Sequence, residues 1–325
     1  MVNRNILLAA DVLHARGMIL AMMSLDLGFF ALPEARFEAN MAKSKKRVTP
    51  EEWWSTSIIE MQPGVIRYCG YAIEDLIGGV GFVNMIWLLT RGDLPQPAQA
   101  KLLEAALVAA VDHGPQAPSI AIARMAVTCG VHINNAMASA INVLGDIHGG
   151  AGEQCVQFYN AIAGRLNGEP GAAKDRHALE TAIEKEMDIM ADKGIQHIPG
   201  FGHRFHPIDP RAPKLLRLVD DATRAGHVSG NFAMIGRGVE NLLAKRKGRK
   251  IPMNIDGATG VVFAELGFPP PLCRGLFVLS RSVGALAHAW EESQSGERNK
   301  GPIPRHLLWN YKGPKPRRLK KNPDG

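Results

Sequence analysis

Apolar residues recur at the spacing of an α-helix along most of the chain from Thr49 onward. This spacing is typical of amphipathic helices, whereas alternating runs of valine and isoleucine, which would indicate strands, are almost absent. A Thr-Pro-Glu-Glu start at 49–52 carries a helix-capping pattern. Further helices are expected at 82–90, 98–112, 118–144, 151–165, 176–193, 211–225, 230–246 and 270–293. The sequence therefore predicts an all-α fold.

The composition supports a globular chain with a sizeable core. Of the 325 residues, 46% are hydrophobic and 21% are charged, which excludes intrinsic disorder as the main state. A polytopic membrane protein is also excluded, because no run of about 18 apolar residues is free of charge or helix breakers.

The net charge of +7 is concentrated at the C-terminal end. Six Lys and Arg residues follow Tyr311, against Asp324 alone, so residues 1–311 carry only +2. A basic nucleic-acid-binding body is not supported, and we expect 312–325 to be a solvated basic tail without a nucleic-acid partner.

The four cysteines are far apart and form no C-x-x-C pair; they are Cys69, Cys129, Cys155 and Cys273. This spacing argues against a zinc site, an iron–sulfur cluster or a disulfide framework. A reducing cytoplasm is the simplest location.

The first forty residues contain an apolar stretch, GMILAMMSLDLGFFAL at 17–32. Asp26 interrupts it and the preceding positive charge is sparse, so it matches a secretory signal poorly. We expect 1–49 to be an extension and favour translation from Met41 over a functional leader. A mature N-terminus just after Ala31 would instead indicate export.

Three glycine-flanked loops interrupt the helical pattern, and each holds a histidine or an acid. They read GDIHGG at 145–150, PGFGHR at 199–204 and NIDG at 254–257. Glycine lets the backbone approach a ligand closely, so a polar side chain on such a turn is a better functional candidate than one on a helix face. Signatures for nucleotide phosphates, zinc proteases and dinucleotides are absent, and we expect neither metal nor nucleotide.

Two histidines and an aspartate on such loops suit proton transfer next to a carbonyl. A carboxylate can remove a proton alpha to a thioester while imidazoles donate hydrogen bonds to oxygens that gain negative charge. Arginines would recognise a polycarboxylate partner through paired hydrogen bonds. Candidates are Arg211, Arg281 and Arg305.

Together these segments resemble the citrate synthase superfamily over roughly residues 56–314. HGGAGE from His148 and GFGHRFHPIDPRA from Gly200 are similar to two family signatures. NIDGATGVVFAELGFP from Asn254 resembles a third. The Asp112-His113 pair and IPRHLLWNYKGP near the C-terminus also match family segments.

The resemblance implies three catalytic roles. Asp256 would take a methyl proton from acetyl-CoA or return one in reverse. His148 would hydrogen-bond the thioester oxygen and stabilise the enol. His203 would polarise the oxaloacetate ketone and hand over a proton as the alkoxide forms.

The resemblance also implies binding roles. His113, Arg211 and Arg281 would hold substrate carboxylates, and Arg305 would do so from the partner subunit of a homodimer. Coenzyme A would be contacted by His197, Gly200, Phe201, Gly202, Arg204 and Lys250.

The family fold implies a large helical domain, 50–150 plus 259–311, and a small one, 151–258. Closing the cleft between the two domains would assemble the site and exclude water.

The residues that differ between branches of the family favour a lyase. Synthases usually carry an aromatic residue after the aspartate, whereas citryl-CoA lyases and the lyase module of ATP-citrate lyase carry glycine, as Gly257 is here. GLFVLSRSVGALAHAWEE from Gly275 and PIPRH from Pro302 are also closer to the lyases. A separate citryl-CoA synthetase could then supply the substrate. The alternatives are citrate synthase, 2-methylcitrate synthase and a non-catalytic CoA- or citrate-binding regulator.

Other polar residues receive structural interpretations. His132 and His288 lie in apolar helical patterns and are expected to be buried packing residues. Asp146 is expected to be a turn or cap residue, and His206 has no assigned role.

Overall fold

The computed structural model describes residues 49–166, 172–203, 206–304 and 306–319. The chain divides into two units, Met1–Ser57 and Ile58–Gly325. The expected leader and the alternative start at Met41 lie outside the described residues. In the first unit, Thr49 caps the short helix α3 (Pro50–Trp53) reciprocally with Glu52, as the Thr-Pro-Glu-Glu pattern predicted.

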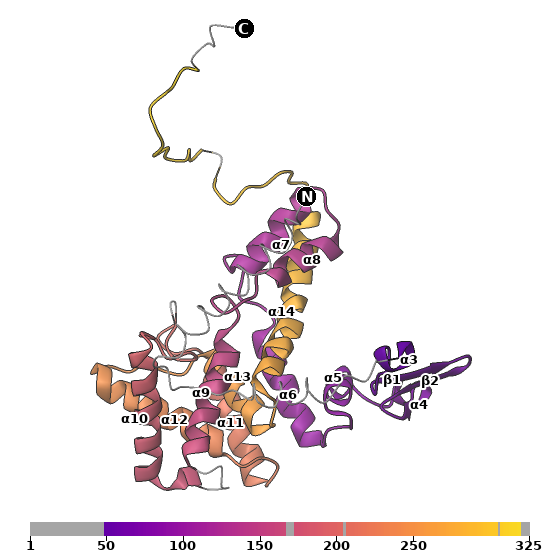
Figure 1. The fold of residues 1–325 in the computed structure, drawn as a ribbon, viewed down its shortest axis with the longest axis vertical. Coiled ribbons are helices and arrows are strands. Elements are labelled where there is room, and N and C mark those ends of the chain that lie inside the picture. Colours follow the sequence, from indigo (N-terminus) through magenta and orange to yellow (C-terminus); the bar gives the residue numbers. More distant parts are fainter. Residues whose placement is uncertain (1–48, 167–171, 204–205, 305, 320–325) are drawn as a thin grey trace, which may run out of the picture. The chain divides into compact units, whose positions relative to one another are not determined.

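The second unit is mostly helical, and the predicted fold class is confirmed (Figure 1). Its helices, in chain order, are α4 (Ile73–Leu76), α5 (Phe82–Arg91), α6 (Pro97–Ala110), α7 (Pro118–Thr128), α8 (Ile133–Asn142), α9 (Ala151–Arg165), the 3-10 turn η1 (Ala172–Lys174), α10 (Arg176–Asp192), α11 (Arg211–Arg224), α12 (Asn231–Lys247), α13 (Ile255–Glu265) and α14 (Pro270–Ser293). Most bounds agree with the helical spacing to within one or two residues.

The prediction of one long helix at 118–144 is wrong, because this stretch forms two helices, α7 and α8. Gly130 has a φ of +87° in the break between α7 and α8. A left-handed residue cannot continue an α-helix, and glycine adopts this conformation without a Cβ penalty.

The second unit begins with a small antiparallel sheet, which the sequence analysis did not predict. Its strands are β1 (Ile59–Gln62), β2 (Val65–Tyr68) and β3 (Tyr71–Ala72), in the order β1-β2-β3. Gln62 pairs with Val65, and Tyr68 pairs with Tyr71, so both turns have two residues. Cys69 and Gly70 both have positive φ, at 47° and 90°, as the tightest hairpin turns require.

Two groups of buried side chains hold the helices together. The main core joins residues of α5, α6, η1, α9 to α13 and the start of α14. A smaller core, rich in alanine, joins α7 and α8 to the second half of α14. Helix α14 therefore contributes to both cores, as its course in Figure 1 shows.

The main core contains residues from both expected domain ranges, 50–150 plus 259–311 and 151–258. The division into a large and a small domain stays a prediction.

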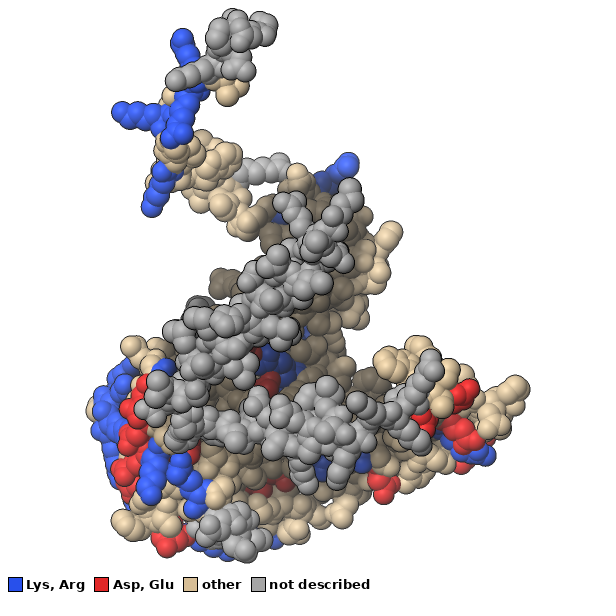
Figure 2. All heavy atoms as spheres, viewed as in Figure 1, with Lys and Arg blue, Asp and Glu red and all other residues tan. Residues whose placement is uncertain are grey.

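The charged surface over α10 and α12 mixes both signs, and red and blue side chains lie together there (Figure 2). Lys245 pairs with Glu180 and Arg246 with Asp188, which joins the two helices. Among the described residues, no helix is both long enough and apolar enough to cross a membrane.

Candidate active site

Asp256 lies in the first turn of α13. The side-chain oxygen of Asn254 accepts hydrogen bonds from the backbone amides of Asp256 (2.9 Å) and Gly257 (3.2 Å), which caps the helix. Burial raises the pKa of the Asp256 carboxyl, although the positive charges of Arg281 and Arg211 oppose this. A desolvated carboxylate is a stronger base than one in water.

The loop that carries His203 is fastened to the segment before α13. The Gly200 carbonyl accepts from the Asn254 amide (2.9 Å), and the Gly202 amide donates to the Pro252 carbonyl (2.7 Å). The Asn254 side-chain amide also donates to the Gly202 carbonyl (2.7 Å). The structure thus brings the second and third predicted loops together.

Two glycines make this contact possible. Gly200 has a φ of +86°, and a Cβ there would lie 2.7 Å from both the Gly257 Cα and the Cys155 sulfur. A Cβ on Gly257 would meet the Gly200 carbonyl and lie 2.5 Å from the Met253 side chain. Gly257, which the sequence marked as lyase-like, is therefore required by close backbone packing beside the candidate base.

His203 is held in one tautomer. The His206 amide donates to Nδ1 of His203 (3.1 Å), so in the neutral ring Nε2 carries the proton and acts as a donor. The ring centroids of His206 and His203 are 4.7 Å apart. The ring centroids of His113 and His203 are 5.9 Å apart, and these two rings are packed edge to face. Burial, with the nearby His206 and Arg211, lowers the pKa of His203 despite Asp209. The neutral donor form is favoured.

His148 lies in the turn between α8 and α9, and it is held in the opposite tautomer. The Ser119 amide donates to Nε2 of His148 (3.2 Å), and the Ser119 hydroxyl lies 2.9 Å from the same nitrogen. The neutral ring therefore carries its proton on Nδ1. Burial, followed by the charge of Arg281, lowers the pKa of His148.

Arg211 begins α11 and is anchored by Asp209. The two side chains form an ion pair (2.8 Å), and the Asp209 carboxylate is buried. A second edge of the guanidinium donates to the Ala109 carbonyl (3.3 Å). The guanidinium stays partly exposed, so it can still contact a ligand.

Arg281 on α14 is buried and sits at the electrostatic centre of the site. Its Nε donates to the Ala110 carbonyl (3.2 Å), and its guanidinium stacks 4.8 Å from the Phe277 ring. After burial, its charge is the largest influence that lowers the pKa of His113 and of His148. It also opposes the raised pKa of Asp256.

Four predicted residues, His113, His148, His203 and Asp256, therefore lie within electrostatic range of Arg281 or Arg211. Asp209, which was not predicted, joins them through its ion pair with Arg211. The arrangement combines one carboxylate of raised pKa, two imidazole donors and two guanidinium groups. Such a set can move a proton at carbon and stabilise oxyanions next to bound carboxylates.

The residues expected to contact coenzyme A are only partly assembled. Gly200, Phe201 and Gly202 lie beside 251–254, and Phe201 packs edge to face on Tyr159 at 6.5 Å. His197 and Lys250 are exposed. Arg204 and Arg305 lie outside the described residues.

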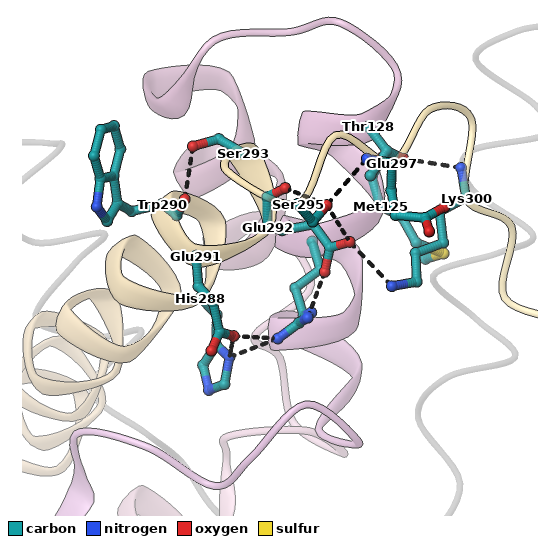
Figure 3. A network of polar contacts seen from close by, with 11 residues as sticks. Met125, Thr128, His288, Trp290, Glu291, Glu292, Ser293, Ser295, Glu297 and Lys300 are labelled. Atoms are coloured by element: carbon teal, nitrogen blue, oxygen red, sulfur yellow. Dashed lines mark hydrogen bonds and ion pairs between the residues drawn. The ribbon is translucent and has the colours of Figure 1, made fainter.

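Two structural interpretations are wrong. His132 is exposed, because it begins α8 after the break at Gly130 rather than lying inside a helix. His288 is in a polar network instead of an apolar one (Figure 3). Its Nε2 lies 3.3 Å from Asp112, and its Nδ1 lies 3.2 Å from Arg124. Asp146 is a turn residue, as predicted, and pairs with Arg274 (2.6 Å).

Three supporting residues were missed by sequence reasoning: Ser119, Asp209 and Asn254. Asn254 precedes the helical residues of α13 and could have been recognised as a cap. Asp209 stands beside Arg211 in Asp-Pro-Arg, but its bond to α13 spans 46 residues. Nothing local to Ser119 indicates that it contacts His148, which is 29 residues away.

Comparison with known sequences finds the family described as "Citrate synthase, C-terminal domain", whose model matches residues 95–305. A citrate synthase of Acidithiobacillus ferridurans is 30% identical over 221 residues, covering 66% of this chain and 52% of that protein. The chain thus spans about half the length of the curated relatives it matches.

Solved structures give the same likeness. A citryl-CoA lyase from Hydrogenobacter thermophilus superimposes with a TM-score of 0.69 at 27% identity, covering 82% of this chain and 97% of that one. An ATP citrate lyase from Methanothrix soehngenii, in complex with citrate and coenzyme A, has the same fold, with a TM-score of 0.63 at 22% identity over 93% of this chain and 48% of that one. With its family signature spanning residues 95–305, the chain belongs to the citrate synthase family.

Proposed function

We propose that the chain makes or breaks the carbon–carbon bond between acetyl-CoA and oxaloacetate, and that it favours cleavage of citryl-CoA. The observation that carries this proposal is the buried guanidinium of Arg281, whose charge acts on His113, His148 and Asp256 together. A dicarboxylate oxo acid has the planar anionic groups that guanidinium groups bind through paired hydrogen bonds.

The acetyl group would be handled by Asp256 and His148. In the condensing direction the Asp256 carboxylate removes a methyl proton while Nδ1–H of His148 donates to the thioester oxygen of the enol. In the cleaving direction the protonated carboxyl returns that proton to carbon. Because burial raises its pKa, the Asp256 carboxylate accepts a proton from carbon more readily than a carboxylate in water does.

The oxo acid would be handled by His203 and the cationic side chains around it. Nε2–H of His203 donates to the ketone oxygen and then to the alkoxide. His113, Arg211 and Arg281 hold the carboxylates. The 5.9 Å between the His113 and His203 rings supports their action on one small ligand.

The cleaving direction is favoured by two observations. The likeness to a citryl-CoA lyase covers nearly the whole of that chain, and Gly257 leaves no room for the aromatic residue that synthases usually carry. A lyase must leave the thioester intact, whereas citrate synthase or 2-methylcitrate synthase, the alternatives, would also hydrolyse it.

Coenzyme A would bind along the loop of Gly200, Phe201 and Gly202. The exposed His197 precedes this loop, the exposed Lys250 precedes the segment 251–254 that pairs with it, and Arg204 would add a cation to that of Lys250. Exposed cations suit the phosphates of coenzyme A, which are anionic at neutral pH. A cytoplasmic location, and supply of citryl-CoA by a separate synthetase, complete the proposal.

The functional unit would be a homodimer, with Arg305 contributed by the partner subunit. Helix α14 supports this, because Leu279, Val283, Leu286 and Trp290 recur on one face and are 45% to 60% exposed. A stripe of this kind usually marks an interface. Sedimentation velocity should give a dimer for the native chain and a monomer for Leu286→Lys. A native monomer at working concentration would refute the shared site.

Citryl-CoA is the substrate that tests the reaction. Oxaloacetate release would be followed through malate dehydrogenase and NADH, and free coenzyme A by thiol titration. We expect oxaloacetate without free thiol. Free thiol from citryl-CoA, and also from acetyl-CoA plus oxaloacetate, would establish a synthase instead.

Inactivity with citryl-CoA and with acetyl-CoA plus oxaloacetate would refute the proposed function. In that case other acyl-CoA and oxo-acid pairs test the 2-methylcitrate synthase alternative first, and calorimetry with coenzyme A and citrate then tests a binding regulator. That alternative predicts that Asp256→Asn changes little, whereas an enzyme loses most of its rate and keeps ligand binding.

A further inference from the structure

The Asp209 carboxylate is a buried junction between two parts of the site. It is 1% exposed, and each of its oxygens accepts two hydrogen bonds. Oδ1 accepts from Nε (2.9 Å) and from the backbone amide (3.1 Å) of Arg211. Oδ2 accepts from Nη2 of Arg211 (2.8 Å) and from the backbone amide of Ile255 (3.0 Å).

On the first side of the junction, Asp209 fixes the direction of a guanidinium. The Nε and Nη2 contacts form a fork with the carboxylate, and Nη1 donates to the Ala109 carbonyl (3.3 Å). A guanidinium held along two edges has little rotational freedom. The remaining N–H groups of Arg211 therefore present one fixed geometry to a ligand.

On the second side, Asp209 completes the cap of α13. The first amide of the helix, that of Ile255, donates to Asp209, and the next two donate to the Asn254 side chain. The first amides of a helix have no partner within it, so these contacts fix the first turn. Asp256 is the second residue of that turn.

We propose that Asp209 is a positioning residue that couples the carboxylate-binding guanidinium of Arg211 to the turn that carries Asp256. The inference rests on the proposed function, because it assigns Asp209 to the same reaction. The negative charge of Asp209 also raises the pKa of the Asp256 carboxyl, which the charge of Arg211 lowers. Asp209 thus sets both where the oxo acid sits and where the base sits.

The test combines Asp209→Asn with Arg211→Gln and their double variant. An asparagine keeps the volume but replaces one oxygen by a donor. At the Oδ1 position this donor faces Nε and the amide of Arg211, and at the Oδ2 position it faces Nη2 of Arg211 and the Ile255 amide. We expect Asp209→Asn to weaken oxaloacetate binding about tenfold in calorimetry, and to lower kcat for citryl-CoA cleavage about 10- to 100-fold.

The double variant separates coupling from simple damage. If Asp209 acts on binding through Arg211, the double variant should bind oxaloacetate no more than about threefold worse than Arg211→Gln alone. Its kcat should still fall relative to Arg211→Gln, because the contact to Ile255 is a separate route to Asp256. Fully additive losses of oxaloacetate affinity would overturn the coupling.

Glu265→Gln is the matched control for a purely structural role. Glu265 ends α13 and its carboxylate accepts from the Gly230, Phe232 and Ala233 amides at the start of α12. Both variants should lower the melting temperature, but only Asp209→Asn should change kcat per folded molecule. Equal kinetic losses in the two variants would overturn the inference.

Two safeguards keep the test decisive. If Asp209→Asn does not fold, Asp209→Glu keeps the charge, displaces it by one methylene, and is judged by the same criteria. If the native chain turns over neither citryl-CoA nor acetyl-CoA plus oxaloacetate, the proposed function is wrong whatever the role of Asp209. Titration with oxaloacetate then decides the inference. Wild-type affinity in Asp209→Asn would then overturn it.

Discussion

The Ser119 amide donates a hydrogen bond to Nε2 of His148 across 3.2 Å, and the Ser119 hydroxyl lies 2.9 Å from the same nitrogen. Ser119 is completely buried in the first turn of α7, whereas His148 lies in the turn between α8 and α9. The pair therefore joins two separate segments and leaves Nδ1–H as the donor toward a ligand.

Replacing Ser119 by alanine should reduce activity moderately. The variant loses the hydroxyl but keeps the backbone amide that sets the tautomer. The imidazole of His148 therefore gains rotational freedom but keeps its proton on Nδ1. We expect kcat/KM for citryl-CoA cleavage to fall about 3- to 10-fold, the value of one hydrogen bond. Ser139→Ala, which removes an exposed hydroxyl bonded to the Asn135 carbonyl on α8, is the control. A Ser119→Ala rate equal to that of Ser139→Ala would refute the role.

Gly200→Ala should destabilise the protein through both its conformation and its surroundings. Gly226→Ala isolates the conformational part, because Gly226 has a similar φ, +76° against +86°, and open space around it. We expect Gly226→Ala to lose about 1 kcal/mol of unfolding free energy, and Gly200→Ala to lose about 1–3 kcal/mol more through overlap with Cys155 and Gly257. Urea titration measures both, and equal losses would show that the loop can move aside.

The helices were predictable wherever one face is buried. The bounds of α9 match the expected 151–165, because apolar residues such as Val156, Tyr159 and Ile162 repeat at helical spacing and are all buried. The sheet at 59–72 was missed because its strands are short and contain no fully buried residue, so they carry no alternating pattern. Its Pro63-Gly64 turn was the available signal.

The site was predictable as a set of loops but not as a set of contacts. Histidine, aspartate and glycine at 148, 203 and 256–257 carry the signature locally. The tautomers of His148 and His203 depend on Ser119 and on a backbone amide, and those contacts form only when the chain folds. The polar contacts of His288 were hidden for the same reason, since its partners Asp112 and Arg124 lie on other segments.

Glu292→Gln should destabilise the smaller core. The Glu292 side chain is buried on α14 and pairs with Arg124 (2.5 Å) and Lys300 (3.0 Å), which holds the segment after the helix (Figure 3). Removing its charge weakens two charge-assisted contacts, although Arg124 keeps its contact with Glu291 (2.7 Å), and we expect a loss of about 1–3 kcal/mol in unfolding free energy at pH 7. Glu297→Gln, at an exposed position nearby, should change little; equal effects would contradict the account.

The same pair gives a pH dependence. Burial favours the neutral acid, but Lys300 and Arg124 outweigh it and lower the pKa of Glu292. Its contribution to stability is therefore present above the pKa of the unfolded chain and is lost as pH falls through the lower folded value. The difference between wild type and Glu292→Gln should shrink in acid.

Asp256→Asn should have the opposite effect on stability. Because burial raises the pKa of Asp256, the folded chain binds a proton more tightly than the unfolded one, and the charged form costs stability at neutral pH. We expect the variant to melt about 2–4 °C above wild type at pH 7. The difference should shrink as pH falls through the raised folded pKa and vanish below the unfolded value of about 3.9, where the carboxyl is neutral in the folded and the unfolded chain. A lower melting temperature at pH 7 would contradict a raised pKa.

Exchange of the acetyl-CoA methyl protons tests most directly the claim that Asp256 moves a proton at carbon. Acetyl-CoA deuterated at the methyl group would be incubated with oxaloacetate in ordinary water, and deuterium loss followed by mass spectrometry. The account predicts loss with the native chain and with Asp146→Asn, an exposed carboxylate paired with Arg274, and a rate about 10²- to 10⁴-fold lower with Asp256→Asn. Equal deuterium loss with Asp256→Asn and the native chain would contradict it.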